Sequence, residues 1–429
     1  MKNKRGLIFS IFCMSLPIAG FAQYNGKAVV ATIQYNTTEP ITAEQLRLQV
    51  EILEKQAGRA ATAQERQQAL DGMIDQKLVI QASAKEKITI SETEINQQIQ
   101  VIKQQMAQSA GRLPTDVEFA DAIKQQTGMD MSAYRDQMRQ QMLINKYITQ
   151  RYLPQVVSKS NVTVSDSELN GQIQTMKNQM AASLGGRQPI DAEFSAAVKQ
   201  QTGLELAAFR AQLKTQMAQQ KYILRLGGGE PTDDDVSTEL RANPALYRQD
   251  GYVQGNYIRI PFTVATKARS KDTADRLIRQ IGSSGEEFLF HFTQIKNNSD
   301  PQNYQNCFAG AEYFVQSITL QRMGKEFFDV AFPSTGADNQ GIRKVSKLIE
   351  TPQEYVILYI LKREKGKDLS LNDTVPEYLG MGSISVKDYI ASALLQQRMN
   401  AGTEALSKNL TNELRKVAVI KTFPQYINW

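Results

Sequence analysis

Side chains that commonly carry chemistry are scarce in this sequence of 429 residues. It has a single histidine, His291, and two cysteines, Cys13 and Cys307. A zinc site needs several nitrogen, sulfur or carboxylate ligands, and a Cys-His or Ser-His-Asp site needs a positioned imidazole. His291 lies on a predicted helix between Phe288 and Phe292, which indicates either a structural role or an exposed position. We therefore expect no catalytic residue of these kinds, no metal and no cofactor.

Nucleotide and redox chemistry are also not indicated. The glycine run 227–229 lacks both the Lys-Ser/Thr of a phosphate-binding loop and the spaced glycines of a dinucleotide fold, and we interpret it as a hinge. Cys307 has no basic neighbour in the sequence that would activate its thiol, so we expect a packed thiol. Positive and negative residues are interspersed throughout, which predicts neither a nucleotide nor a nucleic-acid partner.

The first 22 residues have the pattern of a secretory signal. Three cations among the first five residues precede an apolar run that ends near Ala22, with small residues at the cleavage positions. We expect cleavage after Ala22 and export to the periplasm. A lipid anchor on Cys13 is the less favoured alternative, because bulky Phe12 precedes it inside the run. The run is too short to span a membrane, so we expect a protein that is not membrane-spanning.

The first half of the sequence contains an internal duplication. Residues 90–148 recur as residues 164–223, at an offset of 74 that becomes 75 after one extra residue near Gly185. One exact match is Lys-Gln-Gln-Thr-Gly, found at 124–128 and again at 199–203. This pattern predicts a tandem repeat of one structural module.

Each copy carries the signals of a helical hairpin-like module. Ser91 with Glu94, and Ser165 with Glu168, are spaced so that the hydroxyl caps a backbone N–H while the carboxylate reaches back to the cap residue. Apolar residues then recur at helical spacing, and a glycine ends a short middle helix in both copies.

Stripes of isoleucine and methionine along these helices have two interpretations. In the first copy the stripe consists of Ile95, Ile99, Ile102 and Met106. Adaptable methionine contacts beside Gln- and Asn-rich faces suit the binding of many unfolded chains. The plainer interpretation, which we favour for any single residue, is that the stripes form the core of each module.

Three segments, at 28–33, 40–42 and 66–78, resemble the N-terminal region of the SurA-type periplasmic chaperones. Segments 90–95 and 134–142 are similar to the next helices of that family, which normally occur once, so the duplication is a departure from the family pattern. The resemblance implies an ATP-independent chaperone whose partners are unfolded or extended polypeptides, including outer-membrane proteins.

A second domain is expected after a linker and helix at 229–251. The order of elements over residues 252–364 resembles a parvulin domain, the peptidyl-prolyl isomerase domain of this family. It comprises an alternating strand at 252–261, two helices, the segment 309–314 and a closing strand at 354–358.

The resemblance also implies where this domain would bind peptide. Met323 and Phe327 match the apolar proline pocket of the family, and Asp300 lies at or near its polar Cys or Asp position. The two family histidines fall at Tyr257 and Val356, neither of which can replace paired imidazoles. We therefore expect peptide binding by Met323, Phe327, Asp300 and Tyr257, with no catalytic residue.

The remaining sequence predicts a helical stretch from Val386 to Leu414 and a strand from Val417 to Phe423. In SurA-like proteins this end returns to complete the N-terminal domain, which implies that the last strand pairs with residues 29–33. The expected fold class is mainly α with a smaller α+β domain. A SurA-like helical chaperone domain would cover 23–228 and 365–429, and a degenerate parvulin-like domain would cover 252–364.

Three functions remain open at this point. The first is a periplasmic holdase for unfolded outer-membrane or exported polypeptides, with an inactive parvulin-like domain. The second is an active peptidyl-prolyl cis-trans isomerase that works without the histidines. The third is a dedicated envelope assembly factor with one partner, which a narrow profile in a client pull-down would favour.

Overall fold

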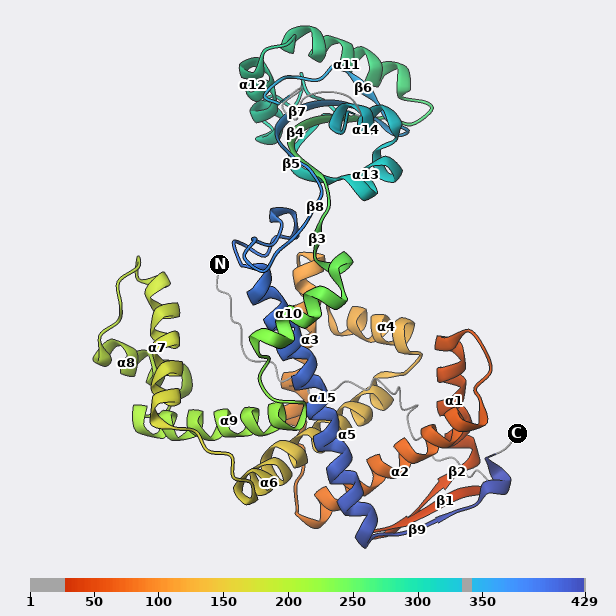
Figure 1. Cartoon of the computed structure of the whole chain (residues 1–429). Coiled ribbons are helices and arrows are strands. Elements are labelled where there is room, and N and C mark those ends of the chain that lie inside the picture. Colours follow the sequence, from red (N-terminus) through yellow and green to blue (C-terminus); the bar gives the residue numbers. More distant parts are fainter. Residues whose placement is uncertain (1–27, 334–341, 428–429) are drawn as a thin grey trace. The chain divides into compact units, whose positions relative to one another are not determined.

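The computed structural model describes residues 28–333 and 342–427 (Figure 1). The expected signal segment, its cleavage site at Ala22 and Cys13 lie outside these residues. The chain is mainly helical with small antiparallel sheets, as expected. It divides into two compact units, of which unit 1 comprises residues up to Glu230 and from Leu395 onward, and unit 2 comprises Pro231–Leu394. No helix in the described ranges is long and apolar enough to cross a membrane.

Unit 1 begins with a strand hairpin that is followed by a series of helices. Its elements before Glu230 are β1 Val29–Gln34, β2 Thr38–Thr42, α1 Ala43–Ala57, α2 Ala63–Lys85, α3 Glu92–Ala110, α4 Asp116–Thr127, α5 Met131–Tyr147, the π-helix η1 Ile148–Tyr152, α6 Leu153–Lys159, α7 Asp166–Ser183, α8 Asp191–Thr202 and α9 Leu206–Leu226.

The end of the chain completes unit 1. Helix α15 Val386–Val417 contributes its residues from Leu395 onward, and β9 Val419–Thr422 and the short η4 Pro424–Tyr426 follow it. Strand β9 pairs antiparallel with β1, and β2 pairs with the other side of β1. The main core of this unit lies against this sheet and draws apolar residues from α1, α2, η1, α9 and α15. Helix α15 extends three residues beyond the predicted Leu414, so the predicted strand starts later, at Val419.

Helices α9 and α15 cross with their backbones in close contact. A Cβ atom on Gly402 would lie 1.9 Å from the carbonyl oxygen of Ile223, and one on Gly227 would lie 1.8 Å from that of Arg398. The Arg398 guanidinium donates to the carbonyl of Glu230 at 3.0 Å. Gly227 therefore belongs to a packed helix end where only glycine permits this approach, whereas no atom of the described residues lies within 4 Å of a Cβ atom on Gly229. The hinge at 227–229 stays a prediction.

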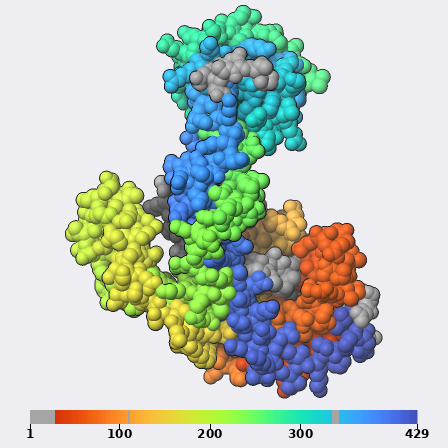
Figure 2. All heavy atoms as spheres, viewed as in Figure 1, coloured from red at the N-terminus to blue at the C-terminus, as the bar shows by residue number. Residues whose placement is uncertain are grey.

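The two copies of the repeated sequence each form three helices with a core of their own. Ile95, Ile99, Phe119, Ile123 and Met138 form the buried core of α3–α5. The buried core of α7–α9 consists of the corresponding set Leu169, Ile173, Phe194 and Val198, joined by Val164. In the space-filling view the yellow atoms, which include α7 and α8, form a compact body (Figure 2). The stripe residues Ile95, Ile99, Leu169 and Ile173 thus pack inside the modules, while Ile102, Met106, Met176 and Met180 are partly buried beside these cores. Client binding by the modules stays a prediction.

Unit 2 combines a four-stranded sheet with flanking helices. Its elements are α10 Asp233–Ala242, η2 Pro244–Tyr247, β3 Arg248–Gln249, β4 Tyr252–Pro261, α11 Lys267–Ile281, α12 Gly285–Lys296, β5 Phe308–Val315, α13 Gln316–Met323, α14 Lys325–Ala331, β6 Ile349–Glu350, β7 Glu354–Glu364, β8 Lys367–Asp368, η3 Glu377–Leu379 and the start of α15. The sheet has the order β5-β4-β7-β6, and all its strand pairs are antiparallel.

Each face of this sheet carries a separate apolar cluster, because successive strand residues point to opposite faces. Helices α11 and α12 cover one face, where Ile258 and Ile357 are buried. Helices α13 and α14 cover the other, where Tyr257 and Leu358 are buried.

The boundaries of unit 2 differ from the expected ones. Residues 231–251, expected to be a linker and helix, and residues 365–394, expected to belong to the chaperone domain, both lie in unit 2. The physical reason is a small core that joins them, in which Val236 and Tyr247 pack with Val375, Val386 and Ile390.

Candidate functional site

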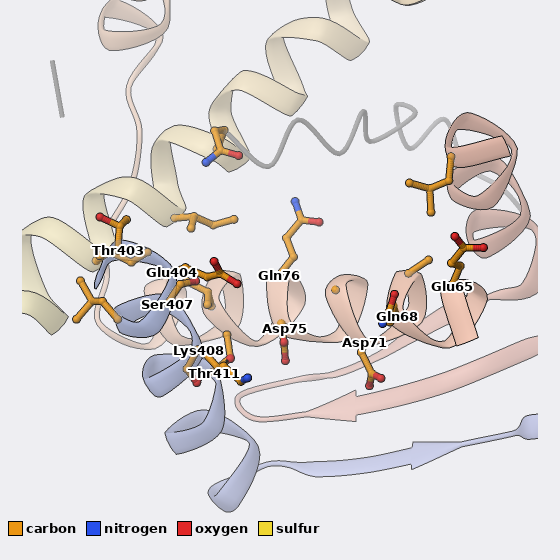
Figure 3. Close-up of a pocket in the computed structure, with 18 of the residues that line it drawn as sticks. Glu65, Gln68, Asp71, Asp75, Gln76, Thr403, Glu404, Ser407, Lys408 and Thr411 are labelled. Atoms are coloured by element: carbon orange, nitrogen blue, oxygen red, sulfur yellow. Dashed lines mark hydrogen bonds between the residues drawn. The ribbon is translucent and has the colours of Figure 1, made fainter. Parts of the chain in front are cut away.

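A groove in unit 1 lies between helices from distant parts of the sequence. It has a volume of about 980 Å³ (Figure 3), at the upper end of the range typical of ligand sites. Helices α1, α2, α5 and α15 supply most of its lining. Helix α2 packs against both α1 and α5 and so forms the centre of the groove.

Helix α2 is held in place by its ends and by one face. Thr62 and Glu65 form a capping box at its start, so that two otherwise unpaired backbone donors are satisfied. Its residues Leu70, Ile74 and Leu78 are fully buried in the core. The adjacent side of the helix, with Gln68, Gly72 and Gln76, faces the groove.

The groove has apolar contact surface that is continuous with the core of unit 1. Val79, Ile148, Ile223 and Leu406 belong to that core and also line the groove. Ile144 of α5, which packs on the edge of the core, extends this surface. A ligand with apolar side chains therefore removes them from water by lying against a surface that is already packed.

Side-chain amides provide most of the neutral polar lining. Gln76 extends from α2 into the groove (Figure 3), and its Nε2 lies 3.5 Å from Oε1 of Gln140 on α5. An amide both donates and accepts hydrogen bonds, so it matches the N–H and C=O of a peptide backbone without selecting a particular side chain. The amides that line the groove are Gln56, Gln68, Gln76, Gln141 and Asn145.

Several carboxylates of the groove are paired with arginine side chains. Arg59 donates to both carboxylate oxygens of Glu65, at 2.9 and 2.7 Å, and these bonds lower the pKa of Glu65 to about 2. Asp71 and Asp75 turn toward Arg415 of α15, whose Nε lies 2.5 Å from Oδ1 of Asp75. Burial nevertheless raises the pKa of Asp75, because it outweighs the lowering by Arg415.

Sequence reasoning did not predict this groove. Segment 66–78 carried the family resemblance, but no binding role was assigned to Gln68 or Gln76. The groove is assembled from residues 53–79, 141–153, 223 and 403–411, and no local pattern connects these stretches. The available signal was the repeated occurrence of glutamine and asparagine next to apolar positions on each of the contributing helices.

Three of the four predicted peptide-binding residues come together in unit 2. Tyr257, Met323 and Phe327 share one apolar cluster with Val356, and all four are buried. Phe314 links them, because its ring lies 4.8 Å from that of Phe327 and 6.1 Å from that of Tyr257. Burial of Met323 and Phe327 leaves little of either side chain exposed to a ligand.

Asp300 does not join this cluster. It lies in the loop after α12, where its carboxylate accepts from the side-chain amide of Asn303 at 2.6 Å. The neighbouring Tyr304 packs against the α11 and α12 face of the sheet. Asp300 therefore belongs to the opposite side of the sheet from Met323, because the loop returns over the helices of that face.

Tyr257, which the sequence resemblance predicts at one family histidine position, has packing partners of its own. The guanidinium of Arg259 lies 4.6 Å from the centre of the Tyr257 ring, and Nη2 lies 3.4 Å from the tyrosine hydroxyl. A Cβ atom on Gly310 would lie 2.4 Å from this hydroxyl, so glycine is needed opposite the ring. Arg259 also lies 3.9 Å from Glu354, whose pKa is raised chiefly by burial. This cluster contains no imidazole.

His291 is buried and Cys307 is partly buried. His291 lies on α12 and its Nδ1 lies 2.7 Å from the hydroxyl of Tyr304. Burial lowers the pKa of His291 and raises that of the free thiol of Cys307 to about 11. Among the described residues no group of three or more His, Cys, Asp or Glu side chains could hold a metal ion.

Comparison with known proteins identifies the first part of the chain. Residues 2–148 match the model of the SurA-like N-terminal domain, so the chain carries a domain of this family. No curated protein sequence matches the chain.

Distant likenesses to solved structures are also present. Two come from a study of the SurA-like chaperones PEB4 and Cj1289 of Campylobacter jejuni. One covers 71% of this chain and 95% of its own at 17% identity with a TM-score of 0.26, and the other covers 71% and 93% at 13% identity with a TM-score of 0.22. The peptidylprolyl isomerase PrsA of Bacillus anthracis covers 61% and 94% at 20% identity with a TM-score of 0.18.

Proposed function

We propose that this protein is an ATP-independent periplasmic holdase that binds extended segments of unfolded outer-membrane or exported polypeptides in the groove of unit 1. The observation that carries the proposal is the combination of five amide side chains with apolar core surface in one groove of about 980 Å³. This groove is built largely on the segment that matches the SurA-like N-terminal domain.

The chemistry of the groove suits a client with variable sequence. Apolar contacts give free energy of binding roughly in proportion to the buried area, and the amides can pair with any peptide backbone. The Arg59–Glu65 and Arg415–Asp75 pairs reduce the fixed charge that the groove presents. We further propose that the protein reaches the periplasm through cleavage after Ala22, and that α3–α5 and α7–α9 are duplicated copies of one module.

We also propose that residues 252–364 form a degenerate parvulin-like domain without isomerase activity. Twisting an X-Pro amide requires lowering a barrier of about 20 kcal/mol with a preorganised polar network. The resemblance predicts Tyr257 and Val356 at the two family histidine positions, and Met323 and Phe327 are packed as core residues. Asp300 belongs to the other side of the sheet, so it cannot supply the missing polar group to that cluster.

The holdase proposal is tested by a charge placed in the groove. Ile144→Asp introduces a carboxylate into the apolar lining, and we expect the affinity for an unfolded outer-membrane protein to fall at least about tenfold. Suppression of client aggregation by the full-length protein should fall with it. The matched control is Gln219→Asp, because Gln219 is the repeat equivalent of Ile144 but does not line the groove.

Circular dichroism verifies that both variants are folded. Equal aggregation suppression by the wild type, Ile144→Asp and Gln219→Asp would remove the groove as the client site. A wild-type protein that leaves aggregation unchanged at stoichiometric excess would remove the holdase function itself.

The second candidate is isomerase activity, which the proximity of Met323, Phe327 and Tyr257 in one cluster favours. A proline-limited refolding assay with the full-length protein tests it, with Met323→Ala as the control. We expect no rate increase from either protein. Catalysis that depends on Met323 would show that the histidines are dispensable and that the protein is an enzyme.

A further inference from the structure

Among the described strands, β5 forms one edge of the sheet in unit 2 and pairs only with β4. The direction of its hydrogen bonds follows from the bond that continues this pairing, in which the N–H of Gln316 donates to the carbonyl of Gly251 at 2.7 Å. Inward and outward hydrogen bonding alternate along an antiparallel strand. Gly310, Glu312 and Phe314 therefore bond to β4, as Phe308 does, and the backbone groups of the alternate residues Ala309, Ala311 and Tyr313 point out of the sheet.

The outward backbone groups of these three residues have no partner in the described part of the chain. The N–H and C=O groups of these three residues form no hydrogen bond with residues 28–333 or 342–427, because they point away from β4. Ala311 is also exposed. Three donors and three acceptors thus stand in a row at the edge of the sheet.

The sequence and register of strand β5 lack the features that usually block strand pairing. Proteins protect exposed edges with lysine, proline, bulges or very short strands. Strand β5 is eight residues long, contains neither lysine nor proline, and pairs with β4 without a register shift. Its one charged residue is Glu312. The backbone groups of Glu312 bond to β4, and its carboxylate is paired with Arg322.

We propose that the outer edge of β5 is a second polypeptide-binding site, which takes an extended apolar segment as an added antiparallel or parallel strand. This inference rests on the proposed holdase function and adds a site in unit 2 to the groove in unit 1. A row of alternating donors and acceptors selects an extended backbone, because a helix has already used its own N–H and C=O groups.

Side chains near this edge favour an apolar segment. Helix α12 packs beside β5, and its Leu289 and Phe290 are exposed, with 56% of Phe290 accessible. Phe308 at the start of β5 is 54% exposed. The bound segment would place alternate side chains on the α13 and α14 face of the sheet, where Phe308 lies because it shares the strand side of Phe314.

Hydrogen–deuterium exchange on the full-length protein tests the proposal directly. The probe is a soluble peptide of about eight alternating valine and threonine residues, a length that matches an ordinary strand. We expect the peptide to slow exchange of the Ala309, Ala311 and Tyr313 amides. Methylation of alternate backbone nitrogens removes the N–H donors from one edge of the extended peptide. Binding of the peptide through that edge should be at least about tenfold weaker than binding of the unmethylated peptide.

Two substitutions at Ala311 provide matched controls. Ala311→Pro removes an outward N–H without removing a bond to β4, and should weaken peptide binding about tenfold, whereas Ala311→Thr keeps the N–H and should bind as the wild type does. Ile144→Asp in the groove should leave protection of β5 unchanged, so failure of the groove and failure of the edge are distinguishable.

Unchanged hydrogen exchange of the β5 amides in the wild-type protein on adding the peptide would overturn the proposal. This result does not depend on whether Ala311→Pro folds. Concentration-dependent dimerisation of the wild type that Ala311→Pro abolishes would also overturn it, because the occupant of the edge would then be a second copy of the chain.

Discussion

The two three-helix modules of unit 1 share their internal contacts but differ in what they offer to the groove. Lys103 pairs with Asp116 and lies 5.7 Å from the ring of Phe119, and the corresponding Lys177 pairs with Asp191 and lies 5.6 Å from that of Phe194. The first module also supplies Gln141, Ile144, Asn145 and Ile148 to the groove, whereas the second supplies Ile223.

The difference shows which residues the fold requires and which are free to change. The Arg112–Glu118 and Arg187–Glu193 pairs brace the same turn in both modules. Positions 144 and 219, by contrast, hold isoleucine in the first module and glutamine in the second. Contacts that hold the three helices together are thus retained in both copies, whereas the groove-lining Ile144 is not, although Gln141 and Ile148 recur as Gln216 and Ile223.

The largest expected effects come from the equivalent core phenylalanines. Phe119→Ala and Phe194→Ala should each destabilise their own module by about 3–5 kcal/mol, because both rings are buried in small cores. Only Phe119→Ala should also weaken client binding, since α5 belongs to its module. Urea unfolding with a client-binding assay measures both effects, and equal loss of client binding in the two variants would make the modules functionally equivalent.

A smaller effect is expected where the second module meets α15. Gly402→Ala should destabilise unit 1 by about 3 kcal/mol, because the new Cβ would lie 1.9 Å from the carbonyl oxygen of Ile223. The matched control is Gly171→Ala on α7, where nothing lies within 4 Å of the added atom. Alanine should stabilise this helix by about 1 kcal/mol. Thermal unfolding measures both, and a neutral Gly402→Ala would show that the crossing can relax.

The smallest expected effects concern the loss of stability at acid pH, which should be alike in the two modules. Glu94 bonds to Lys146 and Glu168 to Lys221, and these contacts lower the pKa of each carboxyl from 4.5 to about 2. A carboxyl whose pKa is lower in the folded state than in the unfolded state stabilises the module when the pH is above the unfolded-state pKa. This contribution is lost as pH falls from about 4.5 toward about 2. Urea midpoints of Glu94→Gln and Glu168→Gln should lose part of this pH dependence, and a change in only one module would contradict the shared network.

Local features of the fold could be predicted from the sequence. The capping boxes of Ser91 with Glu94 and of Ser165 with Glu168 are present, and Gly128 ends α4 with a φ of 74°. These features involve residues within one turn of helix, so their spacing in sequence determines their geometry. The partition of residues 231–251 and 365–394 could not be predicted, because their shared core joins segments more than a hundred residues apart.

The candidate sites show the same limit. Met323 and Phe327 are four residues apart, and the structure places both beside Tyr257. Asp300 was assigned to the same site. The face of the sheet on which Asp300 lies depends on the path of a loop, however, and the periodicity of the sequence does not specify that path. The groove combines residues from α1, α2, α5 and α15, and its lining is defined only once these helices have packed.

Site-specific photocrosslinking tests the central claim, that the groove of unit 1 holds the client, most directly. A photoreactive residue in place of Gln141 would lie in the groove, and one in place of its repeat equivalent Gln216 would be exposed outside it. We expect an unfolded outer-membrane protein to crosslink at position 141 and not at position 216. Crosslinking at position 216 alone, or equally at both positions, would contradict the account.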